Sequence, residues 1–288
     1  MWAELLPHLP LGALLCNLGR MSANRLLAAG KPEVEVVAAR LRDRDAIHQA
    51  RLHPLAVLVA MKTYGSGQGV RGSLKWKTAP AITDALDEAF YLAFENVEPT
   101  GKRTMLALDV SGSMGGPDIA GMPGISPRIA SAALALVTMR TEEKVVVTAF
   151  TSAGGDGMET ATGRGWYNSA ISTLNLSPRQ RLDDVLARID GLPFGGTDCA
   201  LPILYALEKG LEVDTFVVYT DSETWAGNIH PSQALVQYRE RTGIPAKLVV
   251  VGMVSNGFSI ADLKDPGMLD VVGMSTETPQ VISHFIRG

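Results

Sequence analysis

The strongest constraint on the fold of this chain is a regular alternation of short apolar runs and helical patterns that begins near residue 100. The apolar runs are rich in β-branched residues and predict buried strands at about 104–110, 144–150, 215–220 and 246–252. Helical periodicity predicts helices at about 127–141, 179–190, 199–209, 231–242 and 278–287. Strands that are buried on both faces and joined by helices indicate an α/β fold with a doubly wound, mostly parallel sheet.

The residues before about 100 have a helical pattern throughout. Apolar periodicity and prolines at first-turn positions predict helices at about 4–28, 33–51, 54–64 and 80–96. Four short helices of this kind are typical of the end of an antiparallel helical-repeat array. We therefore expect a small all-α segment over 1–98 and an α/β domain over 99–288.

The third and fourth of these helices are joined by the glycine-rich stretch "YGSGQGVRGSLKWK". It lacks the GK[ST] ending of a phosphate-binding loop and follows no strand, so we predict a linker. Arg71, Lys75 and Lys77 surround Trp76, and that tryptophan either contacts nucleic acid or packs against a neighbouring part of the protein.

Composition excludes several classes of protein. With 46% apolar residues over 288, the chain is globular rather than disordered. No apolar run approaches the roughly 20 residues that a membrane span needs, and no basic region precedes the apolar start, so we expect neither a span nor a signal peptide and a cytoplasmic location. Cys16 and Cys199 are far apart and predict neither a disulfide framework nor a zinc site.

Charge is distributed unevenly along the chain. Residues 1–77 carry 11 Lys and Arg against 5 Asp and Glu, whereas residues 78–288 carry 15 against 25. A basic amino-terminal part is suited to a phosphate-bearing ligand, which the acidic remainder would repel.

Polar side chains follow the predicted strands at their carboxyl ends, where doubly wound sheets bind ligands. Asp109, Ser111 and Ser113 follow the first strand, Asp221 follows "VVYT", and Thr197 lies in "PFGGTDC". Carboxylate and hydroxyl oxygens without His or Cys are suited to octahedral Mg²⁺ or Mn²⁺. We therefore predict a divalent-metal site at this edge of the sheet, with one coordination position open.

Other interpretations of the same stretch are weaker. An EF-hand loop starting at Asp109 needs Gly at its sixth position and Glu at its twelfth, but Met114 and Ala120 stand there. A nucleophile elbow needs a glycine two residues before its serine, and neither Ser111 nor Ser113 has one. The remaining alternative is structural: Asp109 caps the following turn, and the serines satisfy backbone donors.

Longer stretches resemble known proteins. The stretches "DVSGSM", "GGTDC" and "YTDSET" resemble the metal-ion-dependent adhesion site (MIDAS) of von Willebrand factor A domains. A resemblance to the carboxyl-terminal half of the Ro ribonucleoprotein autoantigen family lies in "VEPTGKRTMLALDVSGSM", "PFGGTDCALPI", "TDSETWAGNIHPSQAL" and "IPAKLVVVGMVSNGFSIADLKDPGMLDVVG". The last helices of that family's amino-terminal ring, the TROVE module, resemble "HLPLGALLCNLGRM" and "ARLHPLAVLVAMKTYGSGQGVRGSLKW". The chain is thus similar to bacterial-type Ro proteins, without most of the ring.

The resemblance implies a ribonucleoprotein component that binds small noncoding RNA such as Y RNA, acts in RNA processing or quality control, and is not itself an enzyme. It implies neither a DNA nor a membrane partner. Part of the RNA surface would lie among basic residues of the helical segment, namely Arg20, Arg25, Arg40, Arg42, Arg44 and Arg51.

For the A domain, the resemblance implies that Ser111, Ser113 and Thr197 bind Mg²⁺ or Mn²⁺ directly. Asp109 and Asp221 would contact the ion or its bound waters. An exonuclease or another protein partner would supply an acidic side chain to the open position. A metal-dependent protein adaptor without RNA binding is the alternative function, because most of the ring has no counterpart here.

Overall fold

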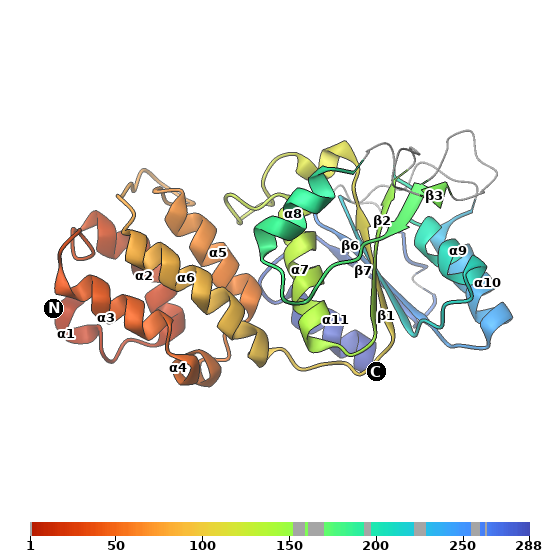
Figure 1. Ribbon diagram of the computed structural model, residues 1–288, viewed down its shortest axis with the longest axis horizontal. Helices are drawn as coiled ribbons and strands as arrows, with labels where there is room; N and C mark the ends of the chain where they lie inside the picture. Colours follow the sequence, from red (N-terminus) through yellow and green to blue (C-terminus); the bar gives the residue numbers. More distant parts are fainter. Residues whose placement is uncertain are drawn as a thin grey trace. The chain divides into compact units, whose positions relative to one another are not determined.

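The computed structural model describes residues 2–151, 159–160, 170–192, 197–221, 229–254, 260–262 and 264–288. The chain divides into two compact units (Figure 1). Unit 1 comprises Met1–Glu98 with Gly121–Ile125, and unit 2 comprises Pro99–Ala120 with Ser126–Gly288.

The regular elements described in unit 1 are all helices. Its elements are α1 (Trp2–Leu5), α2 (Leu11–Ala23), α3 (Pro32–Leu41), α4 (Arg44–Gln49), α5 (Pro54–Gly65), α6 (Pro80–Leu92) and the short 3₁₀ helix η1 (Ala93–Asn96). A proline occupies the first helical position of α3, α5 and α6, where its missing N–H costs nothing.

Two of the predicted helices of this unit are each divided in two. The prediction of one helix over 4–28 was wrong, because α1 ends before Pro7 and α2 begins after Pro10. The prediction of one continuous helix over 33–51 was also wrong, because α3 ends at Leu41 and α4 begins at Arg44. There the Asp43 side chain accepts the backbone N–H of Ala46 at 3.0 Å and so starts a new helix, α4.

Apolar faces of these helices form the core of unit 1. Its fully buried side chains include Leu14, Leu18 and Met21 of α2, Val37 and Leu41 of α3, Val57 and Leu58 of α5, and Ile82, Leu86 and Phe90 of α6. The Tyr64 hydroxyl ties three segments together, since it accepts the backbone N–H of Ala79 and shares a hydrogen bond with the Ser22 hydroxyl, each at 3.0 Å.

The glycine-rich stretch between α5 and α6 is an ordered hairpin rather than a linker. Its arms are joined by the Trp76 N–H donating to the Gly67 carbonyl at 2.9 Å. The Trp76 indole donates to the Tyr64 carbonyl at 3.0 Å and stacks on the Tyr64 ring. A Cβ at Gly19 would lie 2.6 Å from the indole, so α2 needs glycine there. Trp76 is therefore a packing residue of unit 1.

Unit 2 is an α/β domain with a seven-stranded mixed sheet. Its strands are β1 (Thr104–Asp109), β2 (Val145–Thr151), β3 (Glu159–Thr160), β4 (Ala170–Thr173), β5 (Thr215–Thr220), β6 (Lys247–Gly252) and β7 (Met268–Val272), in the order β3-β4-β2-β1-β5-β6-β7. The neighbouring strands β2, β1, β5, β6 and β7 are all parallel. Strand β4 pairs antiparallel with β2, and β3 pairs antiparallel with β4.

Helices cover both faces of this sheet. They are α7 (Pro127–Thr141), α8 (Leu182–Asp190), α9 (Leu201–Glu208), α10 (Pro231–Thr242) and α11 (Thr278–Arg287), together with the 3₁₀ helix η2 (Gly112–Gly115). Figure 1 shows α7, α8 and α11 on one face and α9 and α10 on the other. The expected doubly wound, mostly parallel fold is confirmed.

All four predicted strands are present, and three further strands were not predicted. The two outermost on one side, β3 and β4, are short. On the other side β7 forms the edge, is only partly buried, and contains Asp270. Short or half-exposed strands give weak periodicity, because few of their residues need to be apolar. None of the described helices combines the length and apolarity needed to cross a membrane.

We expect unit 1 to lose stability on acidification through His53, the residue that caps α5. Its Nδ1 accepts the Leu55 N–H at 3.1 Å, and burial lowers its pKa from 6.5 to about 4. Between these values the unfolded chain binds a proton that the folded chain does not, so stability falls as the pH drops from about 6.5 toward 4. Urea unfolding at a series of pH values measures this.

Asparagine at this position keeps a capping acceptor but cannot titrate, so His53→Asn should flatten the pH dependence in that window. His230→Asn is the matched control, because His230 caps α10 in the same way while remaining exposed. An unchanged pH profile in His53→Asn would contradict the prediction.

Candidate metal centre at the carboxyl end of the sheet

The candidate residues meet where the strand order of the sheet reverses. The chain passes from β1 to β2 in one direction and from β5 to β6 and β7 in the other, so the carboxyl ends of β1 and β5 border a crevice. Leu108 is paired with Tyr219 across these strands. The next residues in register, Asp109 and Thr220, therefore lie side by side.

Asp109 is the centre of the cluster. Its side chain is fully buried, and both carboxylate oxygens accept hydrogen bonds. Oδ1 accepts the backbone N–H of Ser111 at 2.8 Å. Oδ2 accepts the hydroxyls of Thr220 at 2.8 Å and Thr197 at 3.1 Å. The carboxylate thus joins the β1 end, the β5 end and the loop before α9.

The electrostatics of Asp109 reflect this burial. Removal from water raises its pKa to about 6, while the hydrogen bonds from Ser111 and Thr220 oppose the rise. The nearby negative charge of Asp221 raises the pKa further. Burial and the charge of Asp221 therefore both disfavour the charged form of Asp109, and a nearby cation would relieve that cost.

The two serines lie on the turn that follows β1. Ser111 is buried and Ser113 is exposed, and their hydroxyl oxygens are 3.1 Å apart. η2 begins directly after Ser111, and this tight turn places both hydroxyls on the same side. The DxSxS spacing therefore brings Ser111 against the Asp109 carboxylate and the Ser113 hydroxyl against that of Ser111.

Thr197 and Asp221 complete the predicted set. Thr197 is 3% exposed and contacts Asp109, and the half-buried Asp221 directly follows β5. The neighbouring Asp198 has a different role, because its Oδ1 accepts the Ala200 N–H at 3.1 Å at the start of α9. Burial raises the pKa of Asp198 to about 6.

Two further residues at the cluster were missed by the sequence reasoning. Thr220 ends β5 and donates to Asp109. Arg128, near the start of α7, donates from Nη2 to the Ser111 carbonyl at 3.2 Å and pairs through Nη1 with Asp190 at 2.7 Å. Thr220 could have been predicted, because it directly precedes Asp221 at the end of a predicted strand. No local sequence pattern indicates that Arg128 contacts the cluster.

The donor set is that of a hard-cation site. Its oxygens come from carboxylates and hydroxyls, which are the ligands that Mg²⁺ and Mn²⁺ prefer. Within the described part of the chain, no three His, Cys, Asp or Glu side chains group closely enough to hold a metal. The hydroxyls would therefore have to supply much of the coordination.

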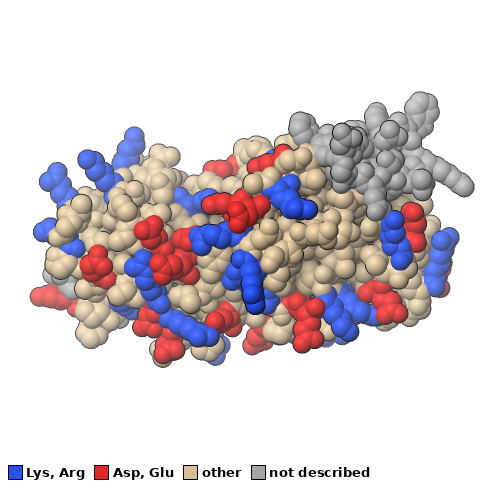
Figure 2. Space-filling view, in the orientation of Figure 1, with Lys and Arg blue, Asp and Glu red and all other residues tan. Residues whose placement is uncertain are grey.

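The six candidate RNA-contacting arginines fall into two groups. Arg40 donates to the carbonyls of Leu6 and Leu9, and Arg42 and Arg44 form ion pairs with Glu88 at 3.0 Å and Glu95 at 2.6 Å. The other group is exposed and forms no ion pair with any residue that the structure describes; it consists of Arg20, Arg25 and Arg51. Figure 2 shows basic side chains along the upper edge of unit 1 and mixed signs over the rest of its visible face.

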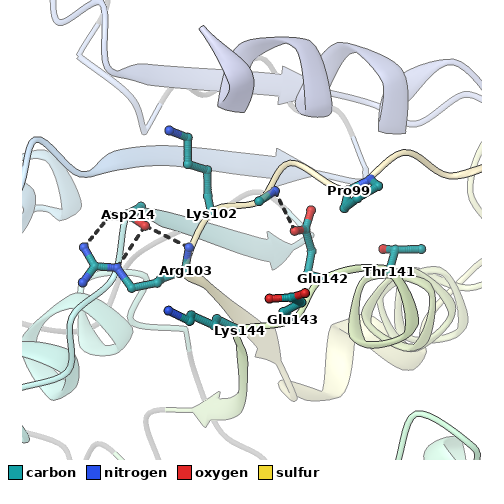
Figure 3. Close-up of a pocket in the computed structure, with 9 residues that line it drawn as sticks. Pro99, Lys102, Arg103, Thr141, Glu142, Glu143, Lys144 and Asp214 are labelled. Carbon is teal, nitrogen blue, oxygen red and sulfur yellow. Dashed lines mark hydrogen bonds and ion pairs between the residues drawn. The ribbon is translucent and has the colours of Figure 1, made fainter.

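A separate cavity of about 580 Å³ lies at the opposite, amino-terminal end of the strands (Figure 3). Two of its acidic groups, Asp214 and Glu142, are already engaged by the chain itself. Asp214 binds the Arg103 guanidinium and backbone N–H, and Glu142 accepts the Gly101 N–H at 3.0 Å. This ion pair holds the pKa of Asp214 below its usual value. These contacts therefore have a structural role, since they join the segment before β1 to the segment before β5.

Comparison with known proteins gives consistent matches. The Ro60 vWA domain family matches residues 103–286, and the TROVE domain family matches residues 1–64. "RNA-binding protein RO60" of Deinococcus radiodurans is 44% identical over 274 residues, which cover 95% of this chain and 48% of that protein. The protein of the same name from Caenorhabditis elegans is 37% identical over 281 residues, or 97% of this chain and 40% of that protein.

One solved structure also matches closely. It is the crystal structure of the Deinococcus radiodurans RO (RSR) protein, with a TM-score of 0.86, 44% identity, and coverage of 96% of this chain and 53% of that one. The chain thus spans about half the length of the relatives it matches.

We expect Thr220→Val to destabilise unit 2 more than a comparable change elsewhere in the sheet. The variant keeps the shape of the side chain but removes a hydrogen bond to a buried carboxylate, at a cost of about 1.5–3 kcal/mol. Thr148→Val is the matched control, because Thr148 is equally buried and donates to a neutral carbonyl, that of Leu106. Its cost should be about 0.5–1.5 kcal/mol. Urea unfolding at pH 8 measures both, and equal losses would contradict the prediction.

Proposed function

This chain belongs to the Ro60 family, and on that premise we propose that it is a noncoding-RNA-binding protein whose A domain carries a divalent-metal site. The observation that carries the RNA part is the combination of a TROVE match over residues 1–64 with a net positive charge over residues 1–77. Curated relatives over nearly the whole chain are named RNA-binding proteins. We propose small noncoding RNA such as Y RNA as the ligand, RNA processing or quality control as the context, and the cytoplasm as the location.

Within unit 1, the proposed RNA contacts are Arg20, Arg25 and Arg51. Their exposed guanidinium groups can meet phosphates without breaking an ion pair with a described residue. Arg42 and Arg44 would first have to leave Glu88 and Glu95, and Arg40 would have to leave the carbonyls of Leu6 and Leu9. Nonspecific phosphate contact of this kind supplies affinity that depends on salt.

For the A domain, we propose that Ser111, Ser113 and Thr197 bind Mg²⁺ or Mn²⁺, with Asp109 and Asp221 beside the ion or holding its waters. Two ligands at right angles on an octahedral Mg²⁺, at 2.0–2.1 Å each, lie about 2.8–3.0 Å apart. The serine hydroxyls are 3.1 Å apart, which is close to that spacing. When bound, the ion would supply an open position for an acidic group or a phosphate oxygen.

The alternative function is a metal-dependent protein adaptor, in which a partner such as an exonuclease fills that open position with a carboxylate. It is favoured by the location of the candidate metal ligands, because all of them belong to unit 2. A metal site formed by unit 2 alone does not require the proposed RNA-contacting residues of unit 1. We propose no catalytic role, because the cluster offers hydroxyls and the buried carboxylate of Asp109, which is already committed to three hydrogen bonds.

RNA binding should be measured by fluorescence anisotropy with a small structured RNA bearing a single-stranded tail, at several salt concentrations. We expect Arg20→Gln with Arg25→Gln to weaken binding and to make the log–log salt dependence shallower by about 1.4, since two contacts to single-stranded phosphates are lost. Arg42→Gln with Arg44→Gln removes the same charge and is the control. No binding at low salt would overturn the RNA proposal and favour the adaptor.

Metal binding should be measured by thermal unfolding with Mg²⁺, Mn²⁺ or chelator. We expect either ion to raise the midpoint, by the equivalent of about 2.7 kcal/mol at a hundred times its dissociation constant. Ser113→Ala should reduce this rise with little change in the chelated protein, because the exposed Ser113 hydroxyl has only the Ser111 hydroxyl as a hydrogen-bond partner among described residues. Ser177→Ala, at another exposed serine, is the control, and an unchanged midpoint in the wild type would refute the site.

A further inference from the structure

The side chain of Arg128 supports the turn that carries the two candidate serine ligands. Its Nη2 donates to the Ser111 carbonyl at 3.2 Å, and this carbonyl also accepts the Met114 N–H at 3.2 Å. Two donors from different directions fix the orientation of the peptide group that follows Ser111. Because that peptide begins η2, its orientation sets the path from the Ser111 hydroxyl to the Ser113 hydroxyl.

The same guanidinium also borders the other end of the turn. A Cβ built on Gly115 would lie 3.3 Å from Cζ and from Nη1 of Arg128, so the guanidinium lies close against the glycine backbone. Absence of a side chain at this position allows the close approach. One planar group thus contacts the first and the last residue of the turn from Ser111 to Gly115.

Arg128 is itself held in place from a different element. Its Nη1 pairs with Asp190, the last residue of α8, at 2.7 Å. Its Nε is buried and has no hydrogen-bond partner among the described residues. The hydrogen bonds of Nη1 and Nη2 therefore hold the guanidinium group in its orientation. The carboxylate of Asp190 also offsets a positive charge that would otherwise repel a cation in the crevice.

We propose that Arg128 is a positioning residue for the metal centre, which sets the spacing of the Ser111 and Ser113 hydroxyls and couples it to the end of α8. The inference rests on the proposed metal site for its effect on affinity. Residues that do not bind the metal but orient its ligands through hydrogen bonds commonly contribute about 10–100-fold to metal affinity.

The charge of Arg128 and its positioning role lead to opposite expectations, which makes the proposal testable. If the guanidinium acted only as a nearby positive charge, Arg128→Met would tighten the binding of a divalent cation. If it positions the turn, the same variant should weaken binding about tenfold or more. Arg128→Lys keeps the charge and one donor but not the planar contact with Gly115, and should recover only part of the affinity.

The test is a Mn²⁺ titration of the full chain, together with amide hydrogen exchange of the metal-free protein at Met114 and Gly116, whose N–H groups close the turn. The control is Arg140→Met, which removes another arginine of α7 whose Nε donates to the Pro178 carbonyl. We expect weaker Mn²⁺ binding and faster exchange of both amides in Arg128→Met, and neither effect in Arg140→Met.

Mn²⁺ binding by Arg128→Met that equals or exceeds that of the wild type would overturn the proposal, as would unchanged exchange at the two amides. Faster exchange in Arg128→Met alone, with no Mn²⁺ binding by the wild type, would support the positioning of the turn while refuting the metal site. The two measurements therefore separate failure of the positioning role from failure of the proposed function.

Discussion

The buried carboxylate of Asp109 is the interaction on which the candidate site depends. A charged group that is removed from water must be satisfied by hydrogen bonds or by a cation, otherwise its burial would be strongly destabilising. Three donors meet it, namely the Ser111 backbone N–H and the Thr197 and Thr220 hydroxyls. They come from three separate segments of the chain. Satisfying one carboxylate therefore fixes the β1 end, the β5 end and the entrance to α9 in a single arrangement.

This arrangement explains both the structural and the proposed functional role of the cluster. The structural alternative considered from the sequence is partly realised, since Asp109 does accept the N–H of the turn that follows it. The hydroxyls of Ser111 and Ser113, however, pair with each other rather than with backbone donors. This convergence of oxygen atoms beside the Asp109 carboxylate is what supports the proposed site for a hard cation.

Unit 1 has its own constraint, which is the packing of Trp76 on Tyr64 and Gly19. The tryptophan closes the hairpin between α5 and α6, with its half-buried ring stacked on Tyr64. The exposed cationic side chains of unit 1 include Arg20, Arg25 and Arg51. Pairing of Arg42 and Arg44 with glutamates removes part of the charge that composition alone suggested.

The sequence by itself determined the strand and helix alternation of unit 2 and the DxSxS turn, because both depend on neighbours within one element or one turn. It also identified Asp221 as a neighbour of Asp109, because strand ends in a parallel sheet share an edge, and it identified Thr197 from its motif on the loop before α9. Only the tertiary structure decided the role of Thr220, which is 111 residues from Asp109, and of Arg128, which reaches the turn from a different helix. It also separated the arginines that pair with a glutamate from those without an ion pair among the described residues, because ion pairs between helices depend on packing that no local pattern records.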